Sequence, residues 1–198
     1  MPHAMKRLVI ATLVAHALTL AMAGNASAVM VELPEPVSVR PESLKLLRDA
    51  SGTDRDEWKL VAFGFTRCKN ICPMLIANVS WLMKIAGEEG IPLDGVFVTV
   101  DPDRDSDAVL SRFTAPHGDG MSFVRLEGEA LDSFKDEFGV EAVFLTKNAG
   151  NRVHYQVDHS SMGFLIDPAG RIRVVFDTVD DTKRMVEKLR ENPDFFAR

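Results

Sequence analysis

LVAFGFTRCKNICPMLIANVSWLMKI, residues 60–85, carries both cysteines of the chain between two apolar segments that differ in periodicity. From Leu60 to Thr66 the run is almost continuously apolar, which is typical of a β-strand buried on both faces. From Pro73 onward apolar residues recur at helical spacing, and the pattern ends near Gly87. The stretch therefore predicts a strand, a short cysteine loop and a helix of about four turns.

The same order of elements recurs downstream. GVFVTVD (95–101) predicts a second buried strand, and SDAVLSRFTA (106–115) predicts a helix capped by Ser106. Strand, helix, strand and helix in succession predict a parallel pair of strands joined by a right-handed crossover. MSFVRLEG (121–128) and EALDSFKDEFGV (129–140) predict a third strand and a third helix.

The last third of the chain predicts antiparallel structure. AVFLTKNAGNRVHYQVDH (142–159) and MGFLIDPAGRIRVVFD (162–177) are typical of hairpins, and TVDDTKRMVEKLRENP (178–193) is typical of an amphipathic helix closed by its proline. Residues 29–59 are rich in proline and charge and give only weak strand signals. Early βα units followed by a late hairpin and a terminal helix predict an α/β fold, a thioredoxin-like sandwich with a central mixed β-sheet flanked by helices.

The length and the N-terminal segment predict one exported domain. The chain has 198 residues and 46% hydrophobic composition, enough for one core, which we expect to comprise residues 29–198. Residues 1–28 have the form of a signal peptide: Lys6 and Arg7, an apolar run, and a small-residue end at Ala28. The run is short of the roughly 20 residues that a spanning helix needs, although an uncleaved anchor is the alternative. We therefore expect a soluble periplasmic protein or, if uncleaved, one anchored to the inner membrane and facing the periplasm.

The charge balance excludes nucleic acid as an expected partner. The formal net charge is -6, and residues 1–28 hold two basic and no acidic residues, so their removal changes it to -8. A nucleic-acid-binding domain needs a basic surface, which this balance does not provide. A membrane contact is expected only through the N-terminal segment if that segment is retained.

The spacing of Cys68 and Cys72 favours a reactive pair. A disulfide that closes so small a loop would restrain little unfolded-chain entropy, so a purely structural staple is weakly motivated. Pro73 suits the first position of a helix, which places Cys72 at the helix edge. The helix dipole, Arg67 and Lys69 together favour the thiolate form of both sulfurs. Two inert buried thiols are the alternative.

Three distant segments are expected to meet at the cysteine loop. Asp101 follows a strand predicted to lie parallel to the one before Cys68, so both emerge at the same sheet edge. The antiparallel strand GFLID (163–167) would begin at that edge, and His159 precedes it by a few residues. Two thiolates and an imidazole make a soft site of low coordination number that suits copper in either oxidation state or, less specifically, zinc.

Four other side chains are weaker ligand candidates. His117 and His154 are interpreted as ordinary surface or core histidines. Met74 and Met162 offer thioether sulfur, but each is expected to pack in the core or line the site.

The acidic stretch DPDRDSD (101–107) invites comparison with a calcium-binding loop. The comparison fails because Pro102 intrudes, the sixth position is Ser106 instead of glycine, and the twelfth is Arg112 instead of glutamate. The acids after Asp101 are therefore interpreted as loop and helix-start charges.

Three motifs, in this order, resemble the Sco/SenC family of copper-binding, thioredoxin-fold assembly factors for respiratory oxidases. FGFTRCKNICP (63–73) is similar to the family's copper-binding loop, VTVDPDRDS (98–106) to its Asp-Pro-x-Arg-Asp motif, and YQVDHSSMGFLIDPAGRI (155–172) to its histidine segment. Lys69 and Asn70 depart from the Pro-Asp common between the family's cysteines. The matches span about residues 60–175 and are jointly specific.

The resemblance implies one copper ion per chain, Cu(I) or Cu(II), with Cys68, Cys72 and His159 as its ligands. Asp101 is similar to the acidic residue that the family keeps beside the site, where it holds either the loop or the outer shell of the metal.

Two functions follow from this site. The first is a metallochaperone, not an enzyme, that passes copper to the copper-site (CuA-type) subunit of a respiratory oxidase during assembly. The second is a thiol-disulfide reductase that keeps the oxidase cysteines reduced, because one thiolate can attack and the other resolve. A periplasmic copper donor or thiol reductant is the expected further partner. Only the first function needs His159 as a ligand. A cysteine peroxidase and a copper sensor are weaker alternatives.

Overall fold

The computed structural model describes residues 30–52, 57–69, 71–148, 150–151 and 153–197. The expected signal peptide, residues 1–28, lies outside this part of the chain. Among the described residues, no helix has both the length and the apolar character needed to cross a membrane.

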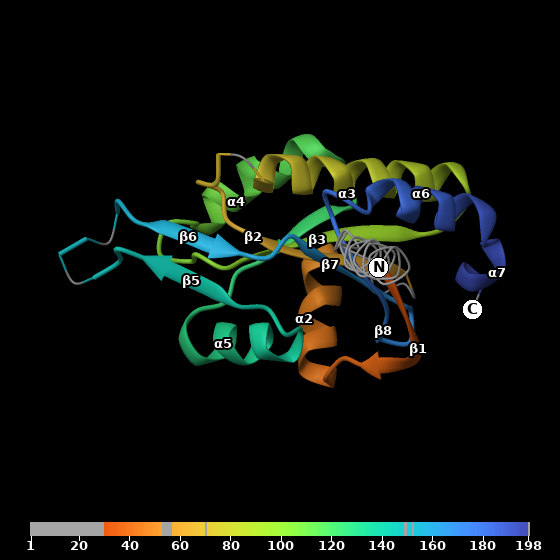
Figure 1. Ribbon diagram of the computed structural model, residues 1–198, viewed down its shortest axis with the longest axis horizontal. Helices are drawn as coiled ribbons and strands as arrows, with labels where there is room; N and C mark the ends of the chain where they lie inside the picture. Colours follow the sequence, from red (N-terminus) through yellow and green to blue (C-terminus); the bar gives the residue numbers. More distant parts are fainter. Residues whose placement is uncertain (1–29, 53–56, 70, 149, 152, 198) are drawn as a thin grey trace, which may run out of the picture.

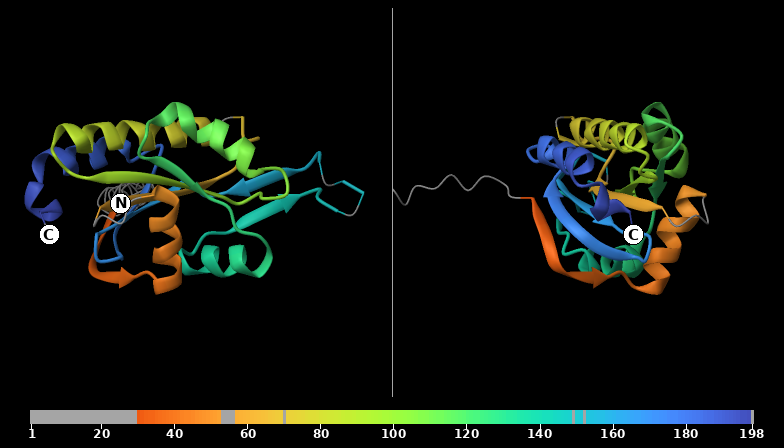
Figure 2. Two further views of the ribbon diagram at one scale, coloured as in Figure 1. Left: turned by 180° about the vertical axis from the view of Figure 1, so that it is seen from behind. Right: turned by 90° about the vertical axis from the view of Figure 1, so that its right-hand side faces the viewer.

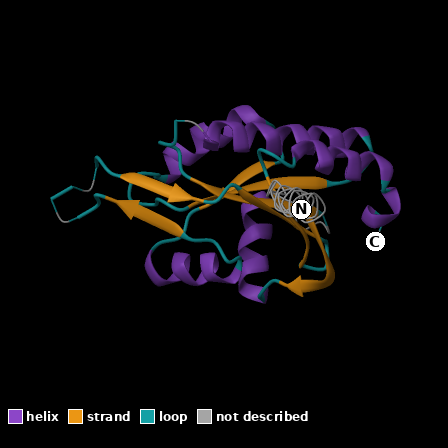
Figure 3. Ribbon diagram, viewed as in Figure 1, coloured by secondary structure: helices purple, strands orange, loops and turns teal. Residues whose placement is uncertain are grey.

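A six-stranded mixed sheet forms the centre of the molecule (Figures 1 and 3). Its strand order is β1-β8-β7-β2-β3-β4, in which β2, β3 and β4 are parallel and β7, β8 and β1 are antiparallel to their neighbours. The strands are β1 (Val31–Ser38), β2 (Trp58–Gly64), β3 (Leu93–Thr99), β4 (Met121–Val124), β7 (Met162–Ile166) and β8 (Arg171–Asp177). The expected α/β fold with a central mixed sheet is confirmed.

Helices cover both faces of this sheet (Figures 1 and 2). The upper layer in Figure 1 contains α3 (Ile71–Glu88), α4 (Asp107–Thr114) and α6 (Thr182–Glu191), and the lower layer contains α2 (Pro41–Ser51) and α5 (Gly128–Glu137). Two short elements, η1 (Ala115–His117) and α7 (Pro193–Phe196), complete the described helices.

The alternation of side chains along β2 explains its continuous apolar run. Leu60 and Ala62 pack into the core beneath α3 and α6, whereas Val61 and Phe63 pack into the core that faces α2 and α5. Because successive side chains of a strand point to opposite faces, a strand covered on both faces must be apolar at every position.

A separate two-stranded sheet projects beyond the end of the main sheet (Figure 1). It is formed by β5 (Ala142–Leu145) and β6 (Gln156–His159), paired so that Ala142 lies opposite His159. Ser160 and Ser161 connect β6 to β7 in the main sheet, so His159 lies where the projecting hairpin joins the domain.

Several local expectations need correction. Helix α3 begins at Ile71, not at Pro73, because the first N–H groups of a helix need no intrahelical partner and proline is tolerated there. Ser106 precedes α4 as expected, but its hydroxyl makes no capping hydrogen bond within the described structure. Pro193 ends α6 but also begins α7.

The segment before β2 was also misread, because it holds a helix as well as a strand. β1 pairs with β8 at the sheet edge, with a break in register between Glu32 and Val37. Helix α2 had its own end signals: Pro41 at the first position, and Gly52, with φ of 65°, just after the end.

Candidate metal centre

The loop that carries Cys68 leaves the carboxyl end of β2. The Cys68 amide donates to the Phe65 carbonyl at 3.3 Å, which tightens the turn, and the half-buried thiol is not in a disulfide. Thr66 is tied to Asp105: its amide and its hydroxyl donate to the carboxylate at 3.0 and 2.5 Å. Asp105 therefore holds the cysteine loop through both the backbone amide and the side-chain hydroxyl of Thr66.

Cys72 lies in the first turn of α3 and is fully buried. Its backbone amide donates to Cys68 Sγ at 3.3 Å, so the two cysteines face one another across the start of the helix. This packing depends on Gly64, because a Cβ at that position would lie 3.3 Å from Cys72 Sγ and 2.8 Å from the Phe97 ring. The glycine lets the helix start approach the end of β2.

His159, the last residue of β6, completes the group. Its Nε2 lies 3.3 Å from Cys72 Sγ, although the two residues are 87 positions apart in the chain. Its Nδ1 lies 2.8 Å from the Ser160 carbonyl, which can only accept, so Nδ1 carries the proton and Nε2 is left with a lone pair toward the sulfur. The Phe65 ring packs edge-on against the imidazole, 5.6 Å between centroids.

Burial controls the protonation of the two contacting side chains. Burial is the largest effect on Cys72 and raises the pKa of its thiol, and the hydrogen bond with Cys68 adds to it. The expected thiolate is therefore wrong for Cys72 in the metal-free protein, because burial disfavours the charged form of its sulfur. Burial also lowers the pKa of His159 from its ordinary value of 6.5, so the imidazole is neutral at pH 7.

The donor set fits a soft metal ion. A coordinating thiol loses its proton outright, so the raised pKa of Cys72 does not prevent ligation. Among the described residues, no three His, Cys, Asp or Glu side chains already form a closed metal-binding group. Cys72 contacts both other candidate ligands: its Sγ lies against His159 Nε2, and its amide donates to Cys68 Sγ.

Asp101 lies at the expected sheet edge, and its described contacts are with residues other than the two cysteines. It is fully buried just after β3, and its carboxylate accepts from the Tyr155 hydroxyl and pairs with Arg104. Asp105, which was interpreted as a loop charge, is also fully buried and accepts from Thr66 and, at 2.7 Å, from the Thr99 hydroxyl. Its place as the last residue of the Asp-Pro-x-Arg-Asp motif was the signal that could have identified it.

The weaker candidates differ in how near the site they lie. Met74 is 48% exposed, and Met162 packs against the core cluster that contains Cys72. His154 is exposed, and His117 lies against Phe113, 6.4 Å between ring centroids.

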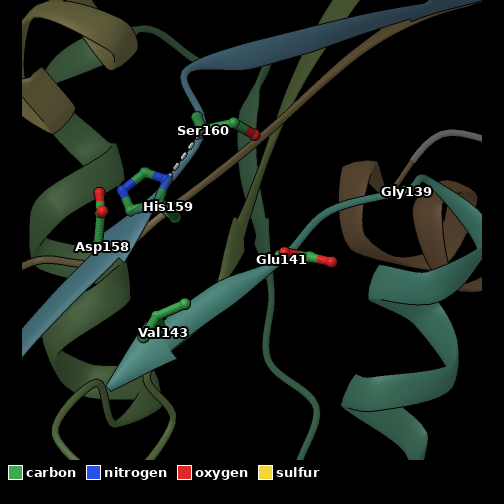
Figure 4. Close-up of a pocket in the computed structure, with 6 residues that line it drawn as sticks. All are labelled: Gly139, Glu141, Val143, Asp158, His159 and Ser160. Atoms are coloured by element: carbon green, nitrogen blue, oxygen red, sulfur yellow. Dashed lines mark hydrogen bonds between the residues drawn. The ribbon is translucent and has the colours of Figure 1, made fainter. Parts of the chain in front are cut away.

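An open pocket of about 450 Å³ lies beside His159 (Figure 4). Its lining residues come from the α5–β5 connection, β5 and the end of β6: Gly139, Glu141, Val143, Asp158, His159 and Ser160. His159 thus contacts Cys72 through Nε2 and also borders a pocket open to solvent.

Known proteins resemble this chain in sequence and in fold. The family model for SCO1/SenC matches residues 51–192. The SCO2-like protein RP587 of Rickettsia prowazekii is 30% identical over 135 residues, 67% of this chain. That match spans 64% of RP587, so the chain covers somewhat less than two thirds of this relative.

Solved structures have the same fold. Apo Sco1 of Thermus thermophilus superposes with a TM-score of 0.64 at 23% identity and covers 84% of this chain and 99% of its own. Arabidopsis thaliana ScoI, solved with copper bound, has a TM-score of 0.59 at 23% identity over 79% of this chain and 98% of its own. BsSco, described as a member of the Sco family of cytochrome c oxidase assembly proteins and as having a disulfide switch, has a TM-score of 0.51 at 23% identity over 81% of this chain and 92% of its own.

The two motif cysteines, the distant histidine that contacts one of them and the family-model match over residues 51–192 agree: this chain belongs to the SCO1/SenC family.

Proposed function

We propose that this protein binds one copper ion through Cys68, Cys72 and His159 and delivers it to the copper-site subunit of a respiratory oxidase during assembly. The observation that carries the proposal is the 3.3 Å contact between Cys72 Sγ and His159 Nε2. A neutral imidazole with its lone pair toward a buried sulfur can share a metal ion with that sulfur, whereas thiol exchange does not need the imidazole as a metal ligand.

The chemistry of the donors supports copper. Thiolates select Cu(I), and an added imidazole makes Cu(II) tenable, so one site can hold both states. The Ser160 carbonyl fixes the tautomer of His159, which is the outer-shell contact that metal-ligating histidines commonly make. Copper is bound in the solved Arabidopsis relative, and BsSco is described with cytochrome c oxidase assembly, which supports an oxidase as recipient.

The test is an anaerobic copper titration of the reduced protein beside His159→Ala and a matched control, His154→Ala. His154 lies just before β6 and is exposed, so its removal changes the same hairpin without touching Cys72. We expect wild type and His154→Ala to bind one equivalent of Cu(II) with intense sulfur-to-copper charge transfer. His159→Ala should lose or shift that absorption and its electron spin resonance spectrum while keeping Cu(I), which two thiolates can hold.

The cysteines are tested separately, because they are required in both oxidation states. Cys68→Ser and Cys72→Ser should each abolish tight copper binding. Retention of the charge-transfer colour in either serine variant, or an unchanged Cu(II) spectrum in His159→Ala, would refute the ligand assignment.

A thiol-disulfide reductase is the second candidate, favoured by the approach of the two cysteines. Neither cysteine is in a disulfide, and the Cys72 amide lies 3.3 Å from Cys68 Sγ, which orients the half-buried sulfur beside the buried one. The half-buried Cys68 would attack and Cys72 would resolve the mixed disulfide. If added Cu(II) oxidised the pair to a disulfide in wild type and in His159→Ala alike, with no persistent complex, this candidate would replace the chaperone.

The cellular location is part of the proposal. Cleavage of residues 1–28 would release residues 29–198 as a working domain into the periplasm, where a copper donor or thiol reductant would meet it. An uncleaved segment would hold the same domain at the inner membrane. Cell fractionation together with N-terminal sequencing of the mature protein distinguishes the two.

A further inference from the structure

The loop Asp101–Asp105, which follows β3, contacts both segments that carry the candidate ligands. On one side, the buried Asp105 carboxylate accepts from the amide and hydroxyl of Thr66 in the cysteine loop. On the other side, Asp101 and Arg104 contact Tyr155, which immediately precedes β6, the strand whose last residue is His159. The two sides use different residues, so their effects can be separated.

Arg104 is the centre of the contact with the hairpin. Its side chain is only 6% exposed and donates through Nε to the Asp101 carboxylate. Its Nη1 donates to the Tyr155 carbonyl at 2.9 Å, and its guanidinium lies 3.7 Å from the centre of the Tyr155 ring. The Tyr155 hydroxyl in turn donates to Asp101, so the three side chains form a closed set of contacts.

The Tyr155 hydroxyl remains a donor throughout the physiological range. Burial is the largest effect and raises the pKa of Tyr155, and the hydrogen bond to Asp101 raises it further. The phenol therefore keeps its proton, and the contact with the carboxylate persists.

This set of residues reaches His159 by two routes. Through the backbone, Tyr155 immediately precedes β6, so its position fixes where the strand begins. Through side chains, the Arg104 guanidinium lies 5.8 Å from the centre of the Phe65 ring, and Phe65 packs edge-on against the imidazole. A change at Arg104 or Tyr155 would consequently move both the strand and the ring.

We infer that Asp101, Arg104 and Tyr155 are positioning residues for His159, which hold the hairpin so that the imidazole meets Cys72. None of the three is proposed to touch the metal. The functional meaning of the inference rests on the copper site proposed above. The Asp-Pro-x-Arg-Asp motif then has two positioning roles. Asp105 positions the cysteine loop, and Asp101 with Arg104 positions β6, the strand that ends at His159.

The test compares Tyr155→Phe and Arg104→Gln with the control Arg125→Gln. Arg125 contacts the same loop, donating to the carbonyls of Asp105 at 2.8 Å and Pro102 at 3.0 Å, but the described structure shows no contact between it and the hairpin. The first readout needs no metal: the ring-nitrogen NMR signals of His159 in the copper-free protein. These signals should shift or broaden in Tyr155→Phe and Arg104→Gln and stay as in wild type in Arg125→Gln.

The second readout is the difference between the two oxidation states of copper. Removing an outer-shell partner of a metal ligand weakens metal affinity, and about tenfold is the lower end of the usual loss. We therefore expect the Cu(II) dissociation constant to rise about tenfold in Tyr155→Phe and in Arg104→Gln, and the charge-transfer band to shift. The Cu(I) dissociation constant should stay within about twofold of wild type, because two thiolates suffice for Cu(I). Arg104→Lys, which keeps the charge but not the planar fork, should fall between wild type and Arg104→Gln.

Two results would overturn the inference. One is an unchanged set of His159 signals in both Tyr155→Phe and Arg104→Gln. The other is an equal loss of Cu(I) and Cu(II) affinity in these variants, which would mean that the three residues support the whole site. If wild type itself bound no copper, the proposed function would fail, and the His159 signals of the copper-free protein would still decide the positioning role.

Discussion

Replacement of Asp105 by alanine should loosen the cysteine loop and destabilise the fold. The buried carboxylate accepts three hydrogen bonds, from the Thr66 amide at 3.0 Å, the Thr66 hydroxyl at 2.5 Å and the Thr99 hydroxyl at 2.7 Å. Asp105→Ala removes all three at once and leaves the Thr66 amide without its acceptor, next to the turn that carries Cys68.

The size of the effect follows from these bonds. Hydrogen bonds to a charged group each contribute about 1.5–3 kcal/mol, but removing the carboxylate also removes the cost of burying its charge. We therefore expect the free energy of unfolding to fall by about 3 kcal/mol, less than the sum of the three bonds. With a urea dependence of about 2 kcal/mol per molar, the unfolding midpoint should drop by about 1.5 M.

The assay is urea unfolding of the copper-free reduced protein, followed by a Cu(I) competition titration under conditions where the variant is folded. Asp105→Asn is the matched control, because its amide keeps one acceptor oxygen and the Thr66 hydroxyl can accept from the new N–H. Asp105→Asn should recover more than half of the lost stability. An unfolding free energy for Asp105→Ala within about 0.5 kcal/mol of wild type, the range of ordinary surface changes, would refute a positioning role for this carboxylate.

Two further predictions concern other positions. Gly64→Ala places a Cβ 2.8 Å from the Phe97 ring and 3.3 Å from Cys72 Sγ, so it should destabilise the protein by about 1–3 kcal/mol in urea unfolding. If the variant were as stable as wild type, the packing of Phe97 and Cys72 against Gly64 would not be tight. Burial lowers the pKa of His117 in the folded protein from its ordinary value of 6.5. Just below pH 6.5 the unfolded chain therefore binds more protons than the folded protein does, and the free energy of unfolding should decline as the pH falls through 6.5. His117→Gln should reduce this decline in unfolding measured between pH 5 and 7.5, and an identical pH profile in the variant would contradict the assignment.

Local patterns were sufficient for most of the secondary structure. β2 and α3 were predicted from apolar runs of different periodicity, because the apolar residues on the buried face of a strand or helix recur at a fixed spacing in the sequence. Helix α2 was missed although Pro41 and Gly52 mark its ends. Only two of its residues, Ser43 and Leu47, are fully buried, so its apolar stripe is too narrow to stand out in a charged, proline-rich segment.

The site could be predicted from the sequence only in part. The cysteine pair was identifiable from spacing and position. His159 was placed near it by the expected strand directions, and the family resemblance then implied that it is a ligand. The protonation of Cys72 was predicted wrongly because a helix start and nearby cations are visible in the sequence, while the depth of burial is not. Asp105 was passed over for the same reason: its burial is not visible in the sequence, and its place as the last residue of the Asp-Pro-x-Arg-Asp motif was the one signal that was not used.

The sequence by itself determined which elements form, where the two cysteines lie between strand and helix, and which family the motifs resemble, because each depends on neighbours along the chain. Only the tertiary structure decided that His159 Nε2 meets Cys72 Sγ across 87 residues. It also decided that Asp101 faces Arg104 and Tyr155 and that Asp105 holds Thr66. Contacts between distant segments depend on how the hairpin and the sheet edge pack together, and burial, which controls the charge of each group, exists only after that packing.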